Sequence, residues 1–232
     1  YGTGCFAMVS IGDTPKLSTS RLLTTVAYSL NGQTQYALEG SIFIAGSVMQ
    51  WLRDGIQIIP NSASSEAIAK AQGSSRGITV VPAFTGLGAP HWDPDARGAI
   101  LGITRDTSRE DIVVACLESV ALQTCDLVQA MQADGISLDA LKVDGGMTEN
   151  QWFVQSLADH LGIKVSCAAN PDTTALGTAY MAGLTAGIYA STSDIEALWQ
   201  DRGEYLPLST TQQRDEQYAL WCDRVERVKH LV

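Results

Sequence analysis

Leu141-Lys142-Val143-Asp144-Gly145-Gly146-Met147-Thr148-Glu149-Asn150-Gln151 is the stretch of this sequence that decides the fold. A short apolar segment ends in Asp-Gly-Gly, and a helix is expected to begin directly after it. We predict Thr148 as the N-cap residue, because Gln151 follows three positions later, as in a capping box. The two glycines allow a backbone or a ligand to approach closely, and the amides of the new helix would face the space left open. The stretch therefore predicts either a site for a nucleotide or another anion, or only a tight strand-to-helix turn.

Composition limits the classes of protein to which the chain can belong. Its 232 residues are 45% hydrophobic and 17% charged, as in a globular chain of one large or two small domains. The formal net charge of −10 argues against binding nucleic acid, because a phosphate backbone needs a basic surface. A small anion needs only a local donor site and remains possible. No apolar run approaches the length of a membrane span, and no signal peptide is recognisable.

The cysteines and histidines indicate neither a disulfide framework nor a metal centre. The five cysteines are odd in number and contain no C-x-x-C pair, so a reducing, cytoplasmic compartment is expected. His91, His160 and His230 lie far apart and lack metal-ligand spacing, so each is expected at the surface or in the core. His91 and Asp93 lie in a loop dense in Gly and Pro, where we expect them to hold the loop together.

The order of the predicted elements favours an α/β domain. Strands are expected over residues 5–12, 22–30 and 35–38, and Asn31-Gly32 is a strong hairpin signal between the last two. These strands would form an antiparallel meander, and β-α units would follow it. We therefore expect a mixed sheet with helices packed on it. Helices are expected over residues 41–54, 66–72, 109–133, 149–161, 173–186, 194–200 and 212–229.

Three of these helices carry more specific expectations. The helix capped by Ser108, with Asp111 at N3, is apolar on nearly all sides, so it is predicted to be the buried central helix. The helix after Pro171 is rich in small residues and is expected to pack closely on a neighbour. Gly46 interrupts the helix over 41–54, which indicates close packing or a ligand lying on the helix.

Several familiar active-site motifs can be set aside. Gly73-Ser74-Ser75-Arg76-Gly77 fits G-x-S-x-G, but a nucleophile elbow follows a strand and precedes a helix, and here the order is reversed. There is no P-loop, and no G-x-G-x-x-G occurs at a strand-to-helix junction. Two glycine sites remain, Asp144-Gly145-Gly146 and Gly2-Thr3-Gly4. The second offers backbone N–H groups and a hydroxyl, which suit a phosphate.

Four segments of the sequence together resemble one family. They are Tyr1–Phe6 (YGTGCF); Tyr36–Gly40 with Ala45-Gly46 and Gln50–Asp54; Val81–Pro90 with Trp92–Pro94 and Ala96–Gly98; and Val143–Gly146 with Asn150. In these segments the chain is similar to the C-terminal half of carbohydrate kinases of the FGGY group. The resemblance covers nearly all of residues 1–232 and implies the ribonuclease H-like, or actin-like ATPase, fold. It also implies that an N-terminal substrate and catalytic domain precedes Tyr1, so that the numbering begins inside a longer polypeptide.

The resemblance implies a function and a set of site residues. It points to ATP-dependent phosphorylation of glycerol, which yields sn-glycerol 3-phosphate and ADP. By analogy with the family, Thr3 would contact the ATP phosphates and Phe6 would contact the carbon atoms of glycerol. The nucleotide pocket would also be lined by Gly46, Gln50, Gly146 and Asn150.

The resemblance also identifies what this chain lacks. The family's catalytic Asp lies in a Gly-Asp-Gln motif upstream of Tyr1, as do the glycerol-binding side chains and most Mg²⁺ ligands. We therefore expect the chain alone to hold part of the nucleotide site and to have no kinase activity, whereas the full-length protein is expected to be a homo-oligomer. Two alternatives remain open: another sugar or polyol kinase of the same group, and a non-catalytic nucleotide-binding or interaction module of the same fold.

Overall fold

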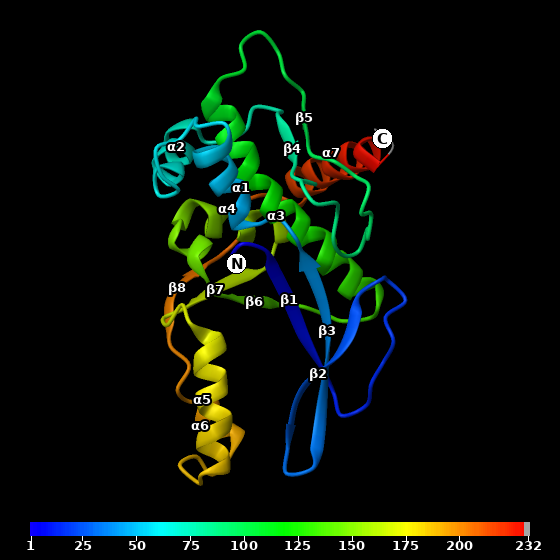
Figure 1. Ribbon diagram of the computed structural model, residues 1–232, viewed down its shortest axis with the longest axis vertical. Helices are drawn as coiled ribbons and strands as arrows, with labels where there is room; N and C mark the ends of the chain where they lie inside the picture. The colour runs from blue at the N-terminus through cyan, green and yellow to red at the C-terminus, as the bar shows by residue number, and fades with distance from the viewer. Residues whose placement is uncertain (230–232) are drawn as a thin grey trace.

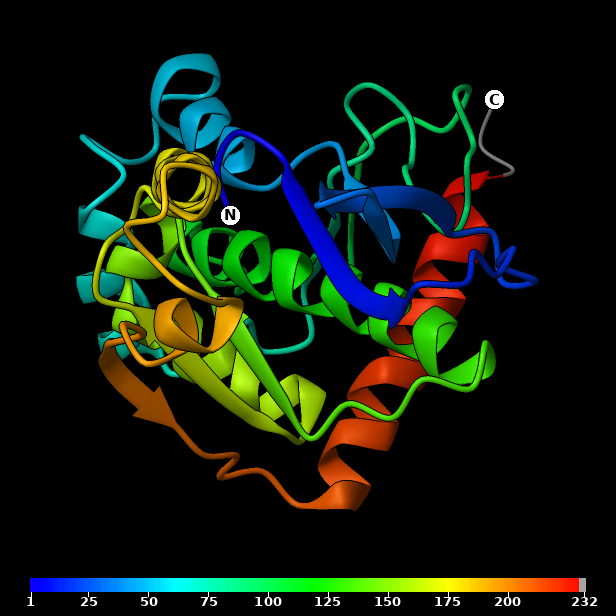
Figure 2. The same cartoon turned by 90° about the horizontal axis from the view of Figure 1, so that it is seen from below.

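A computed structural model describes residues 1–229 of the chain, and His230 lies outside the described residues. The long helix α3 (Arg109–Ala133) runs through the middle of the molecule, with the sheets and the other helices around it (Figures 1 and 2). Its start is capped as predicted, because Ser108 Oγ accepts the N–H of Asp111 while Asp111 Oδ2 accepts the N–H of Ser108. Most of its side chains are buried, which confirms α3 as the central helix.

The first sheet contains the three strands expected from the N-terminal pattern. They are β1 (Cys5–Gly12), β2 (Leu23–Leu30) and β3 (Gln33–Ile42), and all pairs are antiparallel. Their order is β1-β3-β2 rather than the sequential order of a meander, so β3 is the middle strand. The hairpin at Asn31-Gly32 is confirmed, with both residues at positive φ.

The connection between β1 and β2 explains why the order differs. This segment runs past the end of α3, where Asp134 Oδ1 accepts the N–H of Thr19 (2.9 Å) and Asp134 Oδ2 accepts the hydroxyl of Ser18 (2.5 Å). The anchor carries the chain away from β1 before β2 begins, which leaves room for β3 between them. Such a contact, over more than a hundred positions, has no local signal in the sequence.

The segment after the first sheet contains short elements around the N-terminal part of α3 (Figure 1). They are α1 (Gly46–Gln50), a π-helical turn (Trp51–Gly55), α2 (Ser64–Gln72), β4 (Thr79–Val81) and β5 (Ala99–Leu101). The helix expected from residue 41 begins only at Gly46, because residues 41–42 still pair in β3. The strands β4 and β5 form a separate antiparallel pair.

Two side chains of the connection between β4 and β5 hold it in place, as expected. Asp93 Oδ1 accepts the N–H groups of Asp95 and Ala96, both at 3.0 Å. His91 Nε2 lies 3.2 Å from Asp126 Oδ2 on α3. Asp126 also accepts hydrogen bonds from α7 (Thr211–Lys229), so one buried carboxylate joins the loop to two helices.

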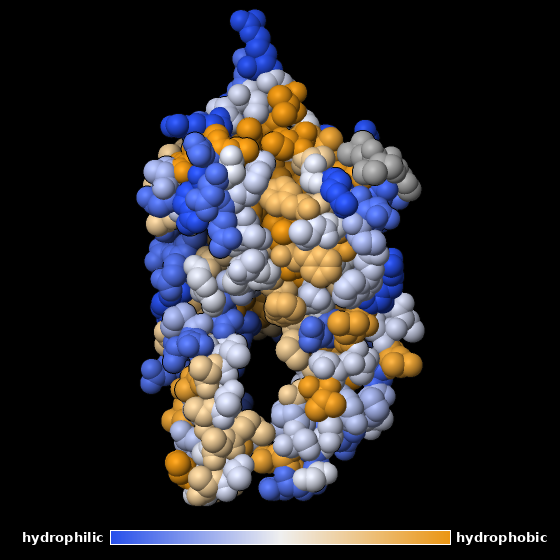
Figure 3. All heavy atoms as spheres, in the orientation of Figure 1, coloured by the Kyte–Doolittle hydropathy of each residue, from blue (hydrophilic) through white to orange (hydrophobic). Residues whose placement is uncertain are grey.

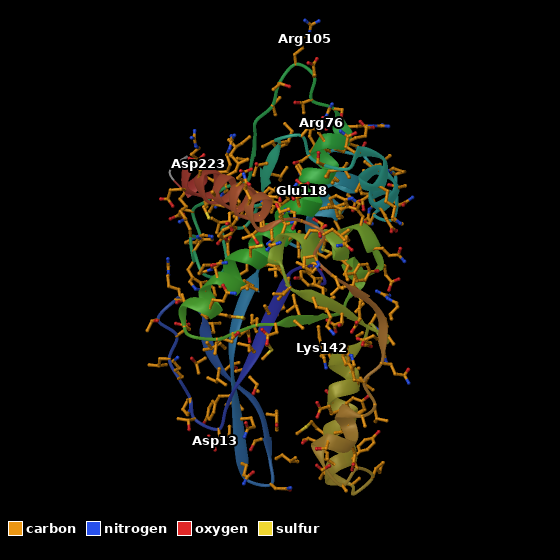
Figure 4. The ribbon with its side chains drawn as sticks, turned by 180° about the vertical axis from the view of Figure 1, so that it is seen from behind. Asp13, Arg76, Arg105, Glu118, Lys142 and Asp223 are labelled. Atoms are coloured by element: carbon orange, nitrogen blue, oxygen red, sulfur yellow. The ribbon has the colours of Figure 1, made fainter. Side chains whose placement is uncertain are left out.

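The rear of the molecule shows how α3 supports the turn after α2 (Figure 4). Arg76 forms an ion pair with the buried Asp111, which lowers the pKa of that carboxyl despite its desolvation. Farther along α3, Glu118 Oε1 accepts the N–H of Ser75, with 3.4 Å between oxygen and nitrogen. Burial raises the pKa of the Glu118 carboxyl. The Gly73–Gly77 segment is therefore a turn held by α3, in agreement with its rejection as a nucleophile elbow.

The last sheet contains the expected β-α unit and is separate from the first sheet. In it, β6 (Ala140–Val143) pairs in parallel with β7 (Lys164–Ala168), and β8 (Asp201–Tyr205) pairs antiparallel to β7. The helix α4 (Gln151–Leu161) joins β6 to β7 and ends at Gly162, as predicted. The strand β8 was not expected, because its polar sequence has no alternation of apolar residues.

The prediction for the start of α4 is wrong in one detail. Gly145 has φ +91° and leads into a 3-10 turn (Gly146–Glu149), so Thr148 is buried and its hydroxyl donates back to Gly145 O. Asn150 is the N-cap instead, because its Oδ1 accepts the N–H of Phe153 at 2.9 Å.

Two arms extend from the body of the molecule. One is the β2–β3 hairpin, and the other consists of α5 (Thr173–Thr185) and α6 (Thr192–Glu196) (Figure 1). Figure 3 shows an opening between the arms, with apolar side chains on both. Only Gly183 is buried in α5, and a Cβ on Gly177 would meet no atom within 4 Å. The expected close contact is therefore found at Gly183, where a Cβ would lie 2.6 Å from the ring of Tyr189, but not at Gly177.

Within residues 1–229, no helix has both the length and the apolar character needed to cross a membrane. The C-terminal helix α7 packs against the body through Trp221 and Val225, which are buried.

Candidate functional site

A pocket of about 380 Å³ lies where the start of the chain meets α1, α2 and the turn after β6. Five segments that are distant in sequence contribute to it, so it exists only in the folded chain. All five residues with an expected nucleotide role line this pocket: Thr3, Gly46, Gln50, Gly146 and Asn150.

The turn that carries Thr3 is fixed from two sides. Tyr1 anchors its start, because the nitrogen of Tyr1 donates to Asp144 O and its hydroxyl lies 2.9 Å from Thr124 Oγ1. Beyond Tyr1, the carbonyl oxygen of Thr3 accepts the N–H and the hydroxyl of Ser47 at the start of α1. The N–H and the hydroxyl of Thr3 itself have no hydrogen-bond partner within residues 1–229, and Thr3 is exposed. The turn is therefore a rigid element with two donors available to a ligand.

Gly46 brings α1 into direct backbone contact with this turn. Its N–H donates to Gly2 O over 2.8 Å, and a Cβ at this position would lie 2.5 Å from that oxygen. A distance of 2.5 Å is shorter than real Cβ contacts allow, so only glycine fits without displacing Gly2. Gly46 thus has the close-packing role that the sequence indicated, and it also lines the pocket.

The two glycines after Asp144 have different environments. Gly145 is held at positive φ, and a Cβ on it would lie 2.5 Å from Tyr1 O. Gly146 is exposed to the pocket, and a Cβ on it would meet no atom within 4 Å. Gly145 is therefore required by the fold, whereas Gly146 leaves open space at the pocket surface.

Two of the first three N–H groups of α4 already have side-chain partners, contrary to the expectation that these groups would face open space. Glu66 Oε1 accepts the N–H of Gln151 at 3.2 Å, and Asn150 Oδ1 accepts the N–H of Phe153. The amide nitrogen of Asn150 in turn donates to Ser65 Oγ at 3.2 Å. Side chains of α2 thus take part in holding this end of α4.

Ser65 and Glu66 are pocket residues that the sequence did not reveal. Each lies 85 positions from its partner in α4, and nothing in the local pattern links the two helices. The remaining wall of the pocket includes apolar side chains from three elements: Met49, Leu117 and Met147. The carboxamide of Gln50, at the end of α1, has no partner among the described residues.

Phe6 lies outside this pocket. It belongs to β1, and its side chain is 68% exposed on the open face of the first sheet. Met8, two positions later on the same face, is 53% exposed. This face is therefore an apolar surface adjoining the Thr3 turn rather than a wall of the pocket.

No set of metal ligands is present in the described part of the chain, where no group of three or more His, Cys, Asp or Glu side chains is placed to hold an ion. The five cysteines are all free, and four of them are buried.

Known proteins resemble this chain over nearly its whole length. Two curated relatives, a glycerol kinase of Alteromonas mediterranea and glycerol kinase 1 of Pseudomonas aeruginosa, are each 52% identical to it over 229 residues. These matches cover 99% of this chain and 46% of each relative. The chain thus spans about half the length of the curated relatives it matches.

A solved structure has the same fold as this chain. The crystal structure of Plasmodium falciparum glycerol kinase with ADP matches this chain with a TM-score of 0.91 and 35% sequence identity. The match covers 100% of this chain and 46% of that one, and it confirms the predicted ribonuclease H-like fold. Residues 1–186 match the model of the FGGY family of carbohydrate kinases, C-terminal domain, and the chain therefore belongs to this family.

Proposed function

We propose that this chain is the C-terminal, nucleotide-binding half of a glycerol kinase. Such an enzyme transfers the terminal phosphoryl group of ATP to a hydroxyl of glycerol, which gives sn-glycerol 3-phosphate and ADP. The observation that supports the proposal is that five residues from distant segments converge on one pocket. Relatives that are 52% identical are named glycerol kinases, and a structural relative was crystallised with ADP.

In this proposal the Thr3 turn binds the phosphates. Its free N–H and hydroxyl would donate to phosphate oxygens, and the bonds from Ser47 and Gly46 hold the turn in place beforehand. Catalysis of phosphoryl transfer depends mainly on positioning and on charge stabilisation, so a fixed donor turn is a useful contribution. Gly146 would let the nucleotide pass close to the backbone, and Gln50 and Asn150 would contact it from either side.

Phe6 would contribute an apolar wall against the carbon atoms of glycerol. It follows the Thr3 turn by three residues, so a substrate on the open face of β1 would lie near the phosphates. A Phe6→Ala variant of the full-length protein should raise KM for glycerol and leave KM for ATP unchanged. An equal rise in both constants would contradict this role.

The chain alone is proposed to be inactive as a kinase. The base that accepts the glycerol proton, the glycerol ligands and the Mg²⁺ ligands would come from the N-terminal half. We also propose that the full-length protein is cytoplasmic, consistent with five free cysteines, and that it is a homo-oligomer. Glycerol-dependent consumption of ATP by the pure chain would contradict the proposed inactivity.

A fusion protein tests the function directly. The chain would be joined to the N-terminal half of glycerol kinase 1 of Pseudomonas aeruginosa, its 52%-identical relative. The proposal predicts glycerol-dependent release of ADP, and the same fusion carrying Gly146→Trp should lose it. Preference for a sugar over glycerol would favour another FGGY kinase. Binding of ATP without any turnover would favour a non-catalytic module.

A further inference from the structure

Asp144, the residue directly after β6, contacts two segments that are distant from it in the sequence. Its backbone oxygen accepts a hydrogen bond from the nitrogen of Tyr1 at 2.9 Å, and its carboxylate oxygen Oδ2 accepts the hydroxyl of Thr173. Thr173 is the first residue of α5. Asp144 therefore connects the start of the Thr3 turn to the start of the arm that consists of α5 and α6.

The hydrogen bond from Thr173 is the polar attachment of this arm to the rest of the molecule. Other side-chain hydrogen bonds of the two helices stay within the arm: Thr178 and Thr185 donate to carbonyl oxygens of α5, and Asp194 accepts N–H groups of the connection between α5 and α6. Within residues 1–229, no other side chain of α5 or α6 forms a hydrogen bond or ion pair with a residue outside the arm. Thr173 is therefore the point at which the arm is bonded to the body.

Tyr1 transmits the position of Asp144 to the Thr3 turn. A Cβ on Gly145 would lie 2.5 Å from Tyr1 O, so the backbones of the two segments are in direct contact. Two residues after Tyr1, the carbonyl oxygen of Thr3 accepts the N–H and the hydroxyl of Ser47. Because backbones packed this closely have little room to adjust separately, a displacement of Asp144 would move the turn as well.

The carboxylate of Asp144 also lies near the other end of this turn. Burial raises the pKa of the Cys5 thiol to about 11, and the negative charge of Asp144 contributes to the rise. Cys5 is the first residue of β1, which follows the turn directly. Asp144 thus borders the Thr3 turn at both of its ends, although it does not line the pocket itself.

We infer that Asp144 is a positioning residue that couples the start of α5 to the Thr3 turn. The hydroxyl of Thr173 fixes the carboxylate of Asp144, the backbone of Asp144 holds Tyr1, and Tyr1 leads into the turn. Loss of the bond from Thr173 should loosen this turn and weaken the binding of phosphates, although Asp144 does not touch the nucleotide. The effect on phosphate binding rests on the proposed function, whereas the effect on the turn is independent of it.

The test uses variants that remove this one hydrogen bond and variants that keep it. Thr173→Val removes the hydroxyl but keeps the shape of the side chain, whereas Thr173→Ser keeps the hydroxyl. Thr178→Val is the matched control, because Thr178 lies on the same helix and donates to Thr174 O at 3.2 Å within α5. Asp144→Ala removes the acceptor, so adding Thr173→Val to it should have little further effect.

Amide hydrogen exchange in the chain measures the turn without any ligand. The N–H groups of Ala45 and Ser47 donate to Thr3 O at 3.0 and 3.1 Å, so their exchange reports opening of the turn. Thr173→Val should raise both exchange rates about fivefold, the effect of losing one hydrogen bond. Thr173→Ser and Thr178→Val should change them less than about twofold. Unchanged exchange in Thr173→Val and in Asp144→Ala would overturn the inference.

Calorimetric titration of ATP and of adenosine separates this role from a general loss of structure. Thr173→Val should bind ATP about fivefold more weakly, whereas its affinity for adenosine, which lacks phosphates, should change less than about twofold. An equal loss of affinity for both ligands would mean that the whole pocket is disturbed and would contradict the coupling. A parent chain that binds neither ligand would overturn the proposed nucleotide role, and the exchange rates would still decide whether α5 and the Thr3 turn are coupled.

Discussion

The N–H of Gly46 lies 2.8 Å from the carbonyl oxygen of Gly2, so α1 begins directly on the turn that carries Thr3. Because the two backbones touch, the shape of the proposed phosphate turn depends on the absence of a side chain at position 46. This contact joins residues that are 44 positions apart into one rigid wall of the pocket.

Gly46→Ala should therefore destabilise the chain. The new methyl group would lie 2.5 Å from Gly2 O, and displacing that backbone is expected to cost about 1–3 kcal/mol in the free energy of unfolding. Urea denaturation measures the change. Gly177→Ala on α5 is the matched control, because a Cβ there meets no atom within 4 Å and alanine favours a helix. Equal stability of the two variants would show that the contact imposes no constraint.

Asp126→Asn should loosen the attachment of α7 and of the loop over residues 82–98. Asp126 accepts hydrogen bonds from Trp221 Nε1 and Tyr218 Oη at 2.9 Å and contacts His91 Nε2 at 3.2 Å. An amide cannot accept from all three donors, so one buried group loses its partner at a cost of about 2 kcal/mol.

Tryptophan fluorescence during urea unfolding would report this change through Trp221. Asp223→Asn is the control, because Asp223 forms an exposed ion pair with Arg227 on the same helix. Its effect should be within about 0.5 kcal/mol. If both variants unfold at the same urea concentration, the buried carboxylate has no special role.

The contacts of Asp134 predict how stability depends on pH. Burial by itself would raise the pKa of Asp134, but hydrogen bonds from Ser18, Thr19 and Ser20 outweigh it and lower the pKa from 3.8 to about 2. The folded state thus favours the ionised carboxylate. Its contribution to stability is complete above the unfolded pKa of 3.8 and is lost as the pH falls toward 2.

Asp134→Asn should remove this contribution. The variant should be less stable than the parent by at most about 2 kcal/mol near neutral pH, and the difference should shrink as the pH approaches 2. Urea unfolding at several acidic pH values tests this, with the exposed Asp13→Asn as control. A difference that stays constant down to pH 2 would mean that titration of Asp134 is not its source.

Local sequence patterns predicted the elements that are determined by neighbouring residues, such as a helix cap or a continuous apolar surface. The long helix α3 followed from the Ser108 cap and a nearly continuous apolar surface, and α4 ends at Leu161, where the expected range of 149–161 ends. The polar strand β8 and the β1-β3-β2 order had no such signal, because pairing with distant partners determines them.

Local sequence patterns also failed to predict parts of the candidate site. Thr148 fits the pattern of an N-cap, but the positive φ of Gly145 creates a 3-10 turn that moves the cap to Asn150. The five nucleotide candidates came from family resemblance, and the fold brings them into one pocket. Ser65 and Glu66 required the structure, because only the packing of α2 against α4 places them there.

Calorimetric titration of ATP into the parent chain and into Gly146→Trp tests the central claim most directly. A side chain at Gly146 enters open space in the pocket without disturbing the backbone, so the variant should fold normally. Gly177→Trp places the same ring in open space on α5 and serves as the control. The account predicts ATP binding by the parent and by Gly177→Trp, and loss of binding in Gly146→Trp. Undiminished binding by Gly146→Trp would place the nucleotide elsewhere and contradict the account.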